Sequence, residues 1–247
     1  MKRSNISWTD YSGGCLNFVL RGKARGDCEV SPGCAHCYAW ILRNRNPQAA
    51  PDQTTYSEDK LRQLAKWKPE VEGNMRGPGS RPMAFVVDMG DLFHHLVPDE
   101  FIKKAFEVVA GRPDVDFQIL TKRPERMAAL FSSVPDNVWV GATVENQEAA
   151  DRRIPYLQKI NAAVRFLSVE PMLDPVHPDL NGIHWVICGG ESGGDRRPFE
   201  KQWAHDLRDD CRRAGAAFYF KQGSHRHPGR DDDLDGEIIK EWPRGGV

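Results

Sequence analysis

Residues 116–153 read DFQILTKRPERMAALFSSVPDNVWVGATVENQEAADRR and contain two copies of one pattern. In each copy a short run rich in β-branched and aromatic residues comes first, and an amphipathic segment follows it. A residue that favours helix starts, Pro124 or Asn146, stands between the two. Strands that alternate with helices are typical of a parallel sheet, because parallel neighbours need a crossover connection. The pattern predicts strands at 116–123 and 138–145 and helices at 124–131 and 146–153.

The same alternation extends on both sides of this stretch. Near-continuous apolar runs, which suit strands covered on both faces, stand at 83–90, 164–171, 184–191 and 217–223. Helical patterns begin after Ser57 and Pro98, and a third ends at Gly215. We therefore predict an α/β fold, either a complete or a partial (β/α) barrel of about six to seven parallel strands, with a short strand at 6–9 as the seventh. An open doubly wound sheet is the alternative.

The whole chain, residues 1–247, is expected to form a single barrel-like domain. Its residues are 40% hydrophobic and 28% charged, which is enough apolar character for a sizeable core. We expect a metal-binding loop at 15–40 near the N-terminus. A hairpin extension at 224–247 would follow the barrel and turn at Asp235 and Gly236.

Charge and hydropathy exclude some classes of partner. The net charge is −1, from 34 Lys+Arg against 35 Asp+Glu, so the chain as a whole does not attract nucleic acid or an anionic membrane. No stretch reaches the roughly 18 apolar residues of a membrane span, and the first residues lack a signal-peptide pattern. We expect a cytoplasmic protein without a membrane partner.

Three cysteines lie within ten residues in the segment GDCEVSPGCAHCYAW, residues 26–40. Five residues separate Cys28 from Cys34, and two separate Cys34 from Cys37. Crowded thiols in a reducing compartment indicate a metal site. Zinc would need a fourth ligand, for which Cys15 or His36 is a candidate. A [4Fe–4S] cluster on three cysteines would leave one iron open to a small chelating molecule.

Polar residues gather where the expected strands end. In a (β/α) barrel the carboxyl ends of the strands share one face, and active sites form there. Lys122 ends one strand, and Lys221 with Gln222 ends the last, so these three side chains are candidates for holding a phosphate or carboxylate of a substrate. For Arg123 we favour a solvent-exposed position.

The chain also resembles a known family through motifs that span residues 6 to 223. These motifs are ISWTD, C-x5-C-x2-C, MGDLFHHLVPDEF, QILTKRPERM, VGATVENQEAADRRIPYL, RFLSVEPML, WVICGGESG and FYFKQG. It is similar to a phage- and bacterium-associated family of uncharacterised three-cysteine-motif proteins, which are themselves similar to radical S-adenosylmethionine enzymes. In those enzymes the ligands are commonly spaced C-x3-C-x2-C with an aromatic residue before the third cysteine. Here the first gap is five residues, His36 takes the aromatic place, and Tyr38 follows Cys37.

The resemblance implies a cofactor and residues that hold it. Cys28, Cys34 and Cys37 would each ligate one iron, and the fourth iron would bind the amino and carboxylate groups of S-adenosylmethionine, whose reductive cleavage would give a 5′-deoxyadenosyl radical. Residues His36 and Tyr38 would lie beside that cofactor. The segments at the ends of the expected strands would hold its other groups: Asp88, Met89, Gly90, Asp91, Glu170, Gly189, Gly190 and Glu191.

Our leading hypothesis from the sequence is therefore an iron–sulfur, radical S-adenosylmethionine-like enzyme. Its substrate is unknown, with a nucleotide or nucleic acid as one option, and a separate partner protein is a further option. A zinc-binding nucleic-acid processing module is the first alternative. A non-catalytic iron–sulfur protein with a structural or redox role is the second.

Overall fold

The computed structural model describes residues 1–12, 17–18, 31–37, 55–70, 74–77 and 79–243. Within these ranges the main sheet has eight strands in the order β1-β2-β5-β6-β7-β8-β9-β10. All neighbours from β2 onward are parallel, and β1 is antiparallel to β2. The strands are β1 Lys2–Arg3, β2 Tyr11–Ser12, β5 Met83–Phe85, β6 Asp116–Thr121, β7 Val138–Thr143, β8 Arg165–Val169, β9 Trp185–Gly189 and β10 Ala217–Gln222. A separate antiparallel pair joins β3 Asn17–Phe18 to β4 Thr55–Tyr56.

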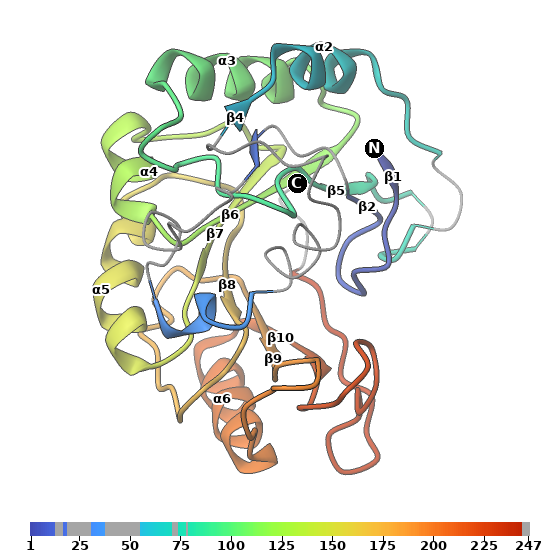
Figure 1. Cartoon of the computed structure of the whole chain (residues 1–247), viewed down its shortest axis with the longest axis vertical. Coiled ribbons are helices and arrows are strands. Elements are labelled where there is room, and N and C mark those ends of the chain that lie inside the picture. The colour runs from blue at the N-terminus through green and yellow to red at the C-terminus, as the bar shows by residue number, and fades with distance from the viewer. Residues whose placement is uncertain (13–16, 19–30, 38–54, 71–73, 78, 244–247) are drawn as a thin grey trace.

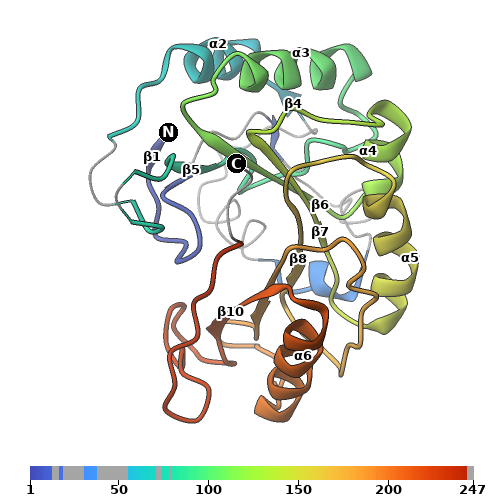
Figure 2. The same ribbon diagram turned by 180° about the vertical axis from the view of Figure 1, so that it is seen from behind.

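The α-helices of the described residues lie along the outer side of the sheet, which curls around an inner face (Figures 1 and 2). Their starts and ends follow the local signals in the sequence. The Ser57 side chain accepts a bond from the Lys60 N–H, and the Asn146 side chain accepts one from the Ala149 N–H. Gly215 ends the last helix with a φ of 73°. The helices are η2 Pro32–Cys34 (a short 3-10 helix), α2 Glu58–Lys66, α3 Asp99–Ala110, α4 Pro124–Leu130, α5 Gln147–Gln158 and α6 Lys201–Ala214.

Alternating residues of each strand face the helices or the inner face. The outward residues of β7, such as Val140, belong to a large core that includes residues of α3, α5 and α6. The inward residues form a second core made mostly of aromatic rings, in which Trp185 lies 6.0 Å from Trp139 and 6.1 Å from Tyr219, between ring centroids. The inner face is thus filled by side chains and is not a pore.

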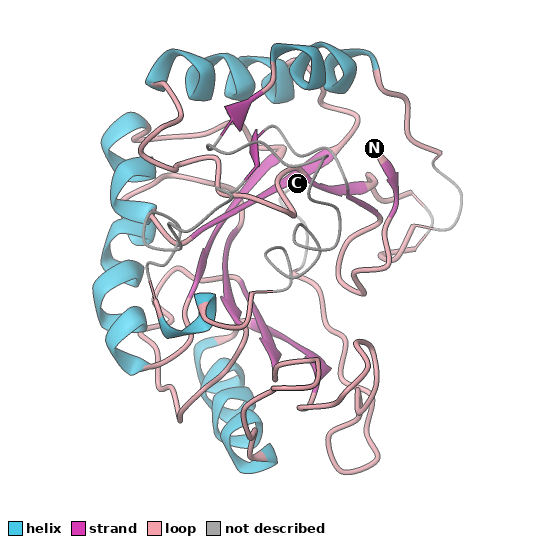
Figure 3. Cartoon of the chain, in the orientation of Figure 1, coloured by secondary structure: helices cyan, strands magenta, loops and turns pink. Residues whose placement is uncertain are grey.

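The sheet is a curled half-barrel in a mixed α/β fold, as the secondary-structure colouring makes plain (Figure 3). The prediction of parallel strands joined by helices is confirmed, but the sheet is not a complete barrel, since β1 and β10 are its two ends and are not paired. The alternative of a doubly wound sheet is wrong: the strand order from β5 to β10 follows the chain, and helices cover one side.

The expected strand at 6–9 is also wrong. These residues form a turn, in which the Thr9 N–H donates to the Ile6 carbonyl at 3.3 Å, and Tyr11–Ser12 takes the place of that strand in the sheet. Trp8 is buried in the inner aromatic core and Ile6 packs against it, so apolar side chains on a turn account for the signal there. No helix of the described residues is both long and apolar enough to cross a membrane.

The C-terminal segment returns along β10. Asp235 and Gly236 have φ angles of 54° and 85°, and Leu234 and Glu237 form an antiparallel bridge across that turn. Beyond it, the Phe220 N–H donates to the Ile239 carbonyl at 2.8 Å, which covers part of the free edge of β10.

Gly141 tests the packing of the inner face. A Cβ atom at this position would lie 2.5 to 2.6 Å from ring atoms of Phe166, which is fully buried and cannot yield. We expect Gly141→Ala to lower the free energy of unfolding by about 1–3 kcal/mol, measured by urea denaturation. Gly111→Ala is the matched control, because a Cβ there would meet nothing closer than 3.6 Å at a φ of −70°. If Gly141→Ala is as stable as the control, Phe166 is not packed against β7 as described.

Candidate functional site

Residues 31–37 contain Cys34 and Cys37 and are called the cysteine turn below. This turn lies across the carboxyl ends of the strands. Ser31 donates a hydrogen bond to Glu145, and Lys122 Nζ donates to Ser31 Oγ at 3.0 Å. Further along the turn, His36 Nδ1 lies 3.2 Å from Glu191 Oε2. The cysteine turn is thus attached to side chains that follow β6, β7 and β9.

The attachment is close at Gly33. A Cβ atom there would lie 2.7 Å from the Glu145 side chain, so the absence of a side chain lets the backbone of the turn reach the carboxylate. Pro32–Cys34 forms the single turn η2, in which the Cys34 N–H donates to the Ser31 carbonyl at 2.9 Å. Cys34 ends η2, and Cys37 follows three residues later. Both thiols are half-buried.

Glu145 is the centre of a buried ion-pair network. Its side chain and that of Arg153, on α5, are both fully buried, and Arg153 Nη1 lies 2.8 Å from Glu145 Oε2. Lys122 makes an ion pair with the other oxygen of the carboxylate. Burial alone would raise the pKa of Glu145, but Lys122 and Arg153 outweigh it and hold that pKa below its usual range. The carboxylate therefore stays ionised at neutral pH.

Glu191 forms a second anchor beyond β9. Arg197 donates to its Oε2 from the backbone N–H at 2.8 Å and from Nε at 3.1 Å, and its guanidinium also binds the other oxygen. Burial would raise the pKa of Glu191, but these hydrogen bonds, with the nearby charges of Arg197 and His36, lower it overall. The turn is held by an ionised carboxylate at this end too.

Glu170 follows β8, and Lys221 belongs to β10. Their side chains form an ion pair on the same face. The strand between them is β9, and it passes beneath the pair at Gly189, where a Cβ atom would lie 3.5 Å from the Glu170 carboxyl. The glycine leaves room for the two longer side chains to meet. Gly189 stands two residues before Glu191, so the ion pair is near the Glu191 anchor in the chain.

Strand alternation explains why these charges share one face. Glu145 and Glu191 stand an even number of residues beyond the inward-facing Trp139 and Trp185, and Glu170 and Lys221 stand at even spacing from Phe166 and Tyr219. Lys122 has the same relation to Gln118, whose side chain donates to the Trp8 carbonyl at 3.4 Å. The inner face is therefore aromatic toward its amino-terminal end and charged at its carboxyl end.

The segment after β5 has a different arrangement. The Asp91 carboxylate accepts bonds from the Phe93 N–H at 2.9 Å, Thr121 Oγ1 at 2.7 Å and Lys122 N–H at 3.2 Å. It also pairs with Arg123 Nη1 at 2.8 Å, so the expected solvent-exposed position of Arg123 is wrong. Asp91 holds the end of β6 in place, and Asp88, Met89 and Gly90 lie half-buried just before it.

Gln222 and Gly190 fill structural places. The Gln222 side chain is buried and bonds the Gly190 carbonyl at 3.2 Å and the Gly229 N–H at 2.7 Å. A Cβ at Gly190 would lie 2.8 Å from the backbone of Gly223, so this glycine permits close approach of β10 to β9. In these contacts, neither residue directs a polar group toward the charged face at the carboxyl ends of the strands.

The cysteines divide into two groups. Cys34 and Cys37 lie on the turn, whereas Cys188 and Cys211 are buried in the outer core, where burial raises the pKa of both thiols. Cys28, Cys15 and Tyr38 lie outside the described residues. Within the residues that are described, no three His, Cys, Asp or Glu side chains are grouped to hold a metal ion.

Four residues of the site were not singled out from the sequence: Ser31, Glu145, Arg153 and Arg197. The period of two from Trp139 through Gly141 and Thr143 identifies Glu145 as inward-facing. Arg153 lacks such a signal, because a buried arginine on a helix has the same local sequence as an exposed one.

Comparison with known proteins gives a family. A family model described as Protein of unknown function (DUF5131) matches residues 3–243, a range that includes the cysteine turn and every charged residue of the site described above. No curated protein and no solved structure matches the chain. The chain belongs to the DUF5131 family, whose description assigns no activity.

Proposed function

We propose that this protein is an iron–sulfur enzyme similar to radical S-adenosylmethionine enzymes, with its cluster on Cys28, Cys34 and Cys37. The observation that supports the proposal is the position of the cysteine turn: Lys122, Glu145 and Glu191 hold it over the carboxyl ends of the parallel strands. In folds built from βα units, that end of the sheet is where cofactors and substrates bind.

The chemistry of the donors fits a cluster. Cys34 and Cys37 are free, half-buried thiols on one turn, and thiolates are the ligands that iron–sulfur clusters use. Three thiolates would leave one iron open to the amino and carboxylate groups of S-adenosylmethionine. When bound, the cluster and S-adenosylmethionine together supply one-electron reductive cleavage of that cofactor.

The chain's own residues would position and enclose this chemistry. The aromatic core below the charged rim closes the inner face, so solvent cannot enter from beneath. The half-buried Lys122 and Lys221 are each paired with a carboxylate, Glu145 and Glu170, so they fix the shape of the rim around a ligand. Glu145 and Glu191 keep the turn in one position, which reduces the reorganisation needed when a ligand binds.

We propose the substrate only as a broad class: a nucleotide or nucleic acid, or a peptide on a partner protein. Net charge of −1 predicts weak, salt-sensitive binding to duplex DNA, since contact would come from a local patch alone.

Metal content after anaerobic reconstitution with iron and sulfide tests the proposal. We expect a brown protein with about four irons and four sulfides per chain. One tightly held zinc and no iron would support the zinc-binding alternative and contradict the proposal. A loss of metal in Cys15→Ala as complete as in Cys34→Ala would mean a fourth protein ligand, and hence no open iron.

A further inference from the structure

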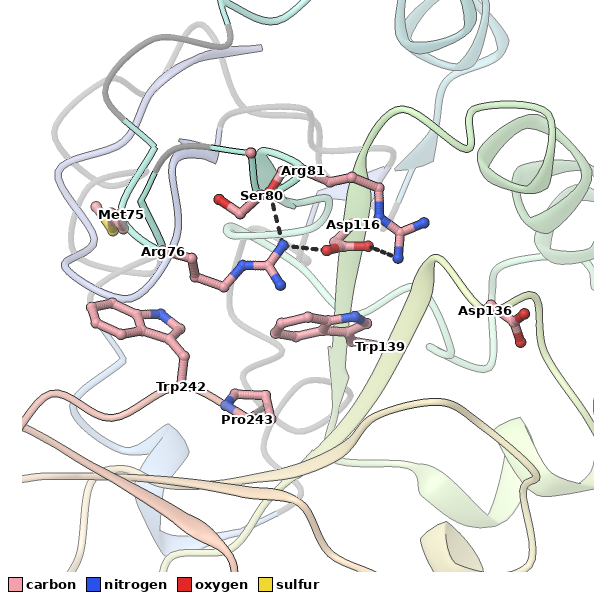
Figure 4. A pocket seen from close by; sticks show the side chains of 10 residues that line it. Met75, Arg76, Ser80, Arg81, Asp116, Asp136, Trp139, Trp242 and Pro243 are labelled. Carbon is pink, nitrogen blue, oxygen red and sulfur yellow. Dashed lines mark hydrogen bonds and ion pairs between the residues drawn. The ribbon is translucent and has the colours of Figure 1, made fainter. Parts of the chain in front are cut away.

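A pocket of about 610 Å³ lies at the amino-terminal end of the sheet, opposite the cysteine turn. Figure 4 shows it from close by, with Arg76, Arg81, Asp116, Trp139 and Trp242 around it. Asp116 is the first residue of β6, and Trp139 is the second residue of β7. The volume is within the range of about 300–1,000 Å³ that small-molecule sites occupy.

Positive charge prevails on one side of the pocket. The Asp116 carboxylate is 1% exposed and faces two guanidinium groups, with Arg81 Nη2 at 2.8 Å and Arg76 as the second partner. One carboxylate thus balances one of the two arginines. The remaining acid of the lining, Asp136, lies on the far side of the pocket from Trp242 (Figure 4). The Arg81 side chain is 37% exposed, so its charge is accessible to a ligand.

Aromatic surface lines the same pocket. The Arg76 guanidinium lies 4.9 Å from the ring centroid of Trp139 and covers that indole. Trp242 is half-buried and packs against the inner aromatic core, with its ring 5.4 Å from that of Tyr219 at an angle of 74°. An indole held in this way offers a platform on which a planar ring can stack.

Two hydrogen-bond donors of the lining have no acceptor among the described residues. Arg76 Nε and Trp242 Nε1 are buried, and no described residue accepts a bond from either of them. A buried donor without a partner destabilises the fold, because it has lost water and gained no acceptor in return. Both atoms are covered by the protein in this structure, so neither one counts as a contact to a ligand in the pocket.

We propose that this pocket binds a mononucleotide-like ligand, that is, a planar heteroaromatic ring with an attached phosphate. The ring would stack at Trp242, and the phosphate would face Arg81. The site lies at the other end of the sheet from the cysteines. It therefore does not depend on the proposed function, and its failure would leave that proposal untouched.

Calorimetric titration of the full chain with AMP, adenosine, ribose 5-phosphate and inorganic phosphate tests this site. We expect AMP to bind at least about tenfold more tightly than each of the other three, because each of them lacks either the ring or the phosphate. Absence of AMP binding at millimolar concentration would overturn the proposal, as would equal affinity for AMP and adenosine.

Variants locate the binding and separate it from the cysteine face. Trp242→Ala should weaken AMP binding by about ten- to hundredfold, and Arg81→Gln should bring AMP close to the affinity of adenosine. Trp242→Phe keeps a stacking ring and should retain most of the affinity, which guards against a folding defect in the alanine variant. Matched controls are Trp203→Phe on α6 and Arg226→Gln on an exposed loop, and both should bind as the unchanged chain does. AMP affinity unaltered by Trp242→Ala and Arg81→Gln would contradict the assignment to this pocket.

Discussion

Glu145→Ala is expected to lower the free energy of unfolding by about 3–5 kcal/mol, because it leaves the charge of Arg153 buried without its carboxylate. Arg153 would keep the Thr143 carbonyl, to which its Nη1 donates at 2.6 Å, but that neutral acceptor cannot replace an ionised one. The same change removes the acceptor of Ser31 and a partner of Lys122. We therefore expect the cysteine turn to loosen, with faster alkylation of Cys34 and Cys37.

Urea denaturation and thiol alkylation measure the two effects separately. Glu148→Ala is the matched control, since Glu148 lies three residues away on the exposed side of α5 and should change stability by less than about 0.5 kcal/mol. The double variant Glu145→Leu with Arg153→Met should regain much of the lost stability, because it replaces both members of the pair by apolar groups. It should not restore slow alkylation of the thiols. A stability loss below about 1 kcal/mol in Glu145→Ala would contradict the network described here.

Acid should act in the same direction as the substitution. Folding lowers the pKa of Glu145, so the stabilisation it provides is complete above the pKa of the unfolded chain and is lost as the pH falls through the pKa of the folded chain. The stability difference between the unchanged chain and Glu145→Gln should therefore shrink on acidification below the ordinary carboxyl range.

Loss of the cluster in the cysteine variants is the second large effect that we expect. Alanine at any one of Cys28, Cys34 and Cys37 should abolish iron binding after reconstitution, because two thiolates do not hold a four-iron cluster. Cys188→Ala and Cys211→Ala should retain full iron and sulfide content, since both thiols are buried in the outer core. Iron and sulfide analysis, with circular dichroism to confirm folding, provides the measurement.

Two results would count against this assignment of ligands. Full iron content in Cys34→Ala or Cys37→Ala would show that the turn does not hold the metal. Loss of iron in Cys188→Ala, with folding intact, would move the metal site away from the charged face.

Local signals in the sequence were sufficient to place strands β5 to β10 and helices α2 to α6, but not the short strands near the N-terminus. The helices α2, α5 and α6 begin or end at Ser57, Asn146 and Gly215, because capping depends on residues that are neighbours in the chain. The closure of the sheet was not predictable in this way. It depends on how far the strands curl and on whether β1 and β10 meet, and no local pattern encodes either.

The candidate site was likewise predictable only in part from local sequence. Its location at the carboxyl ends of the strands, with Lys122, Glu170, Glu191 and Lys221, was accessible from the spacing of strand ends. The pairing of these side chains was not, because Lys221 reaches Glu170 across β9 and Arg153 reaches Glu145 from a helix. Arg123 was misplaced at the surface for a similar reason, since its partner Asp91 is remote in sequence.

The proposed function requires an open iron in a cluster held by the cysteine turn, and the paramagnetic resonance spectrum of the reduced protein tests this requirement most directly. A fully loaded cluster, reduced with dithionite, is compared with and without excess S-adenosylmethionine. We predict a changed spectrum, because the amino and carboxylate groups of that cofactor would enter the ligand shell of one iron. Lys221→Gln, which removes the partner of Glu170, should retain the iron, so it shows whether the rim alters cofactor binding without loss of the metal. An unchanged spectrum of the fully loaded protein in excess S-adenosylmethionine would contradict the account and leave a structural or redox role for the cluster.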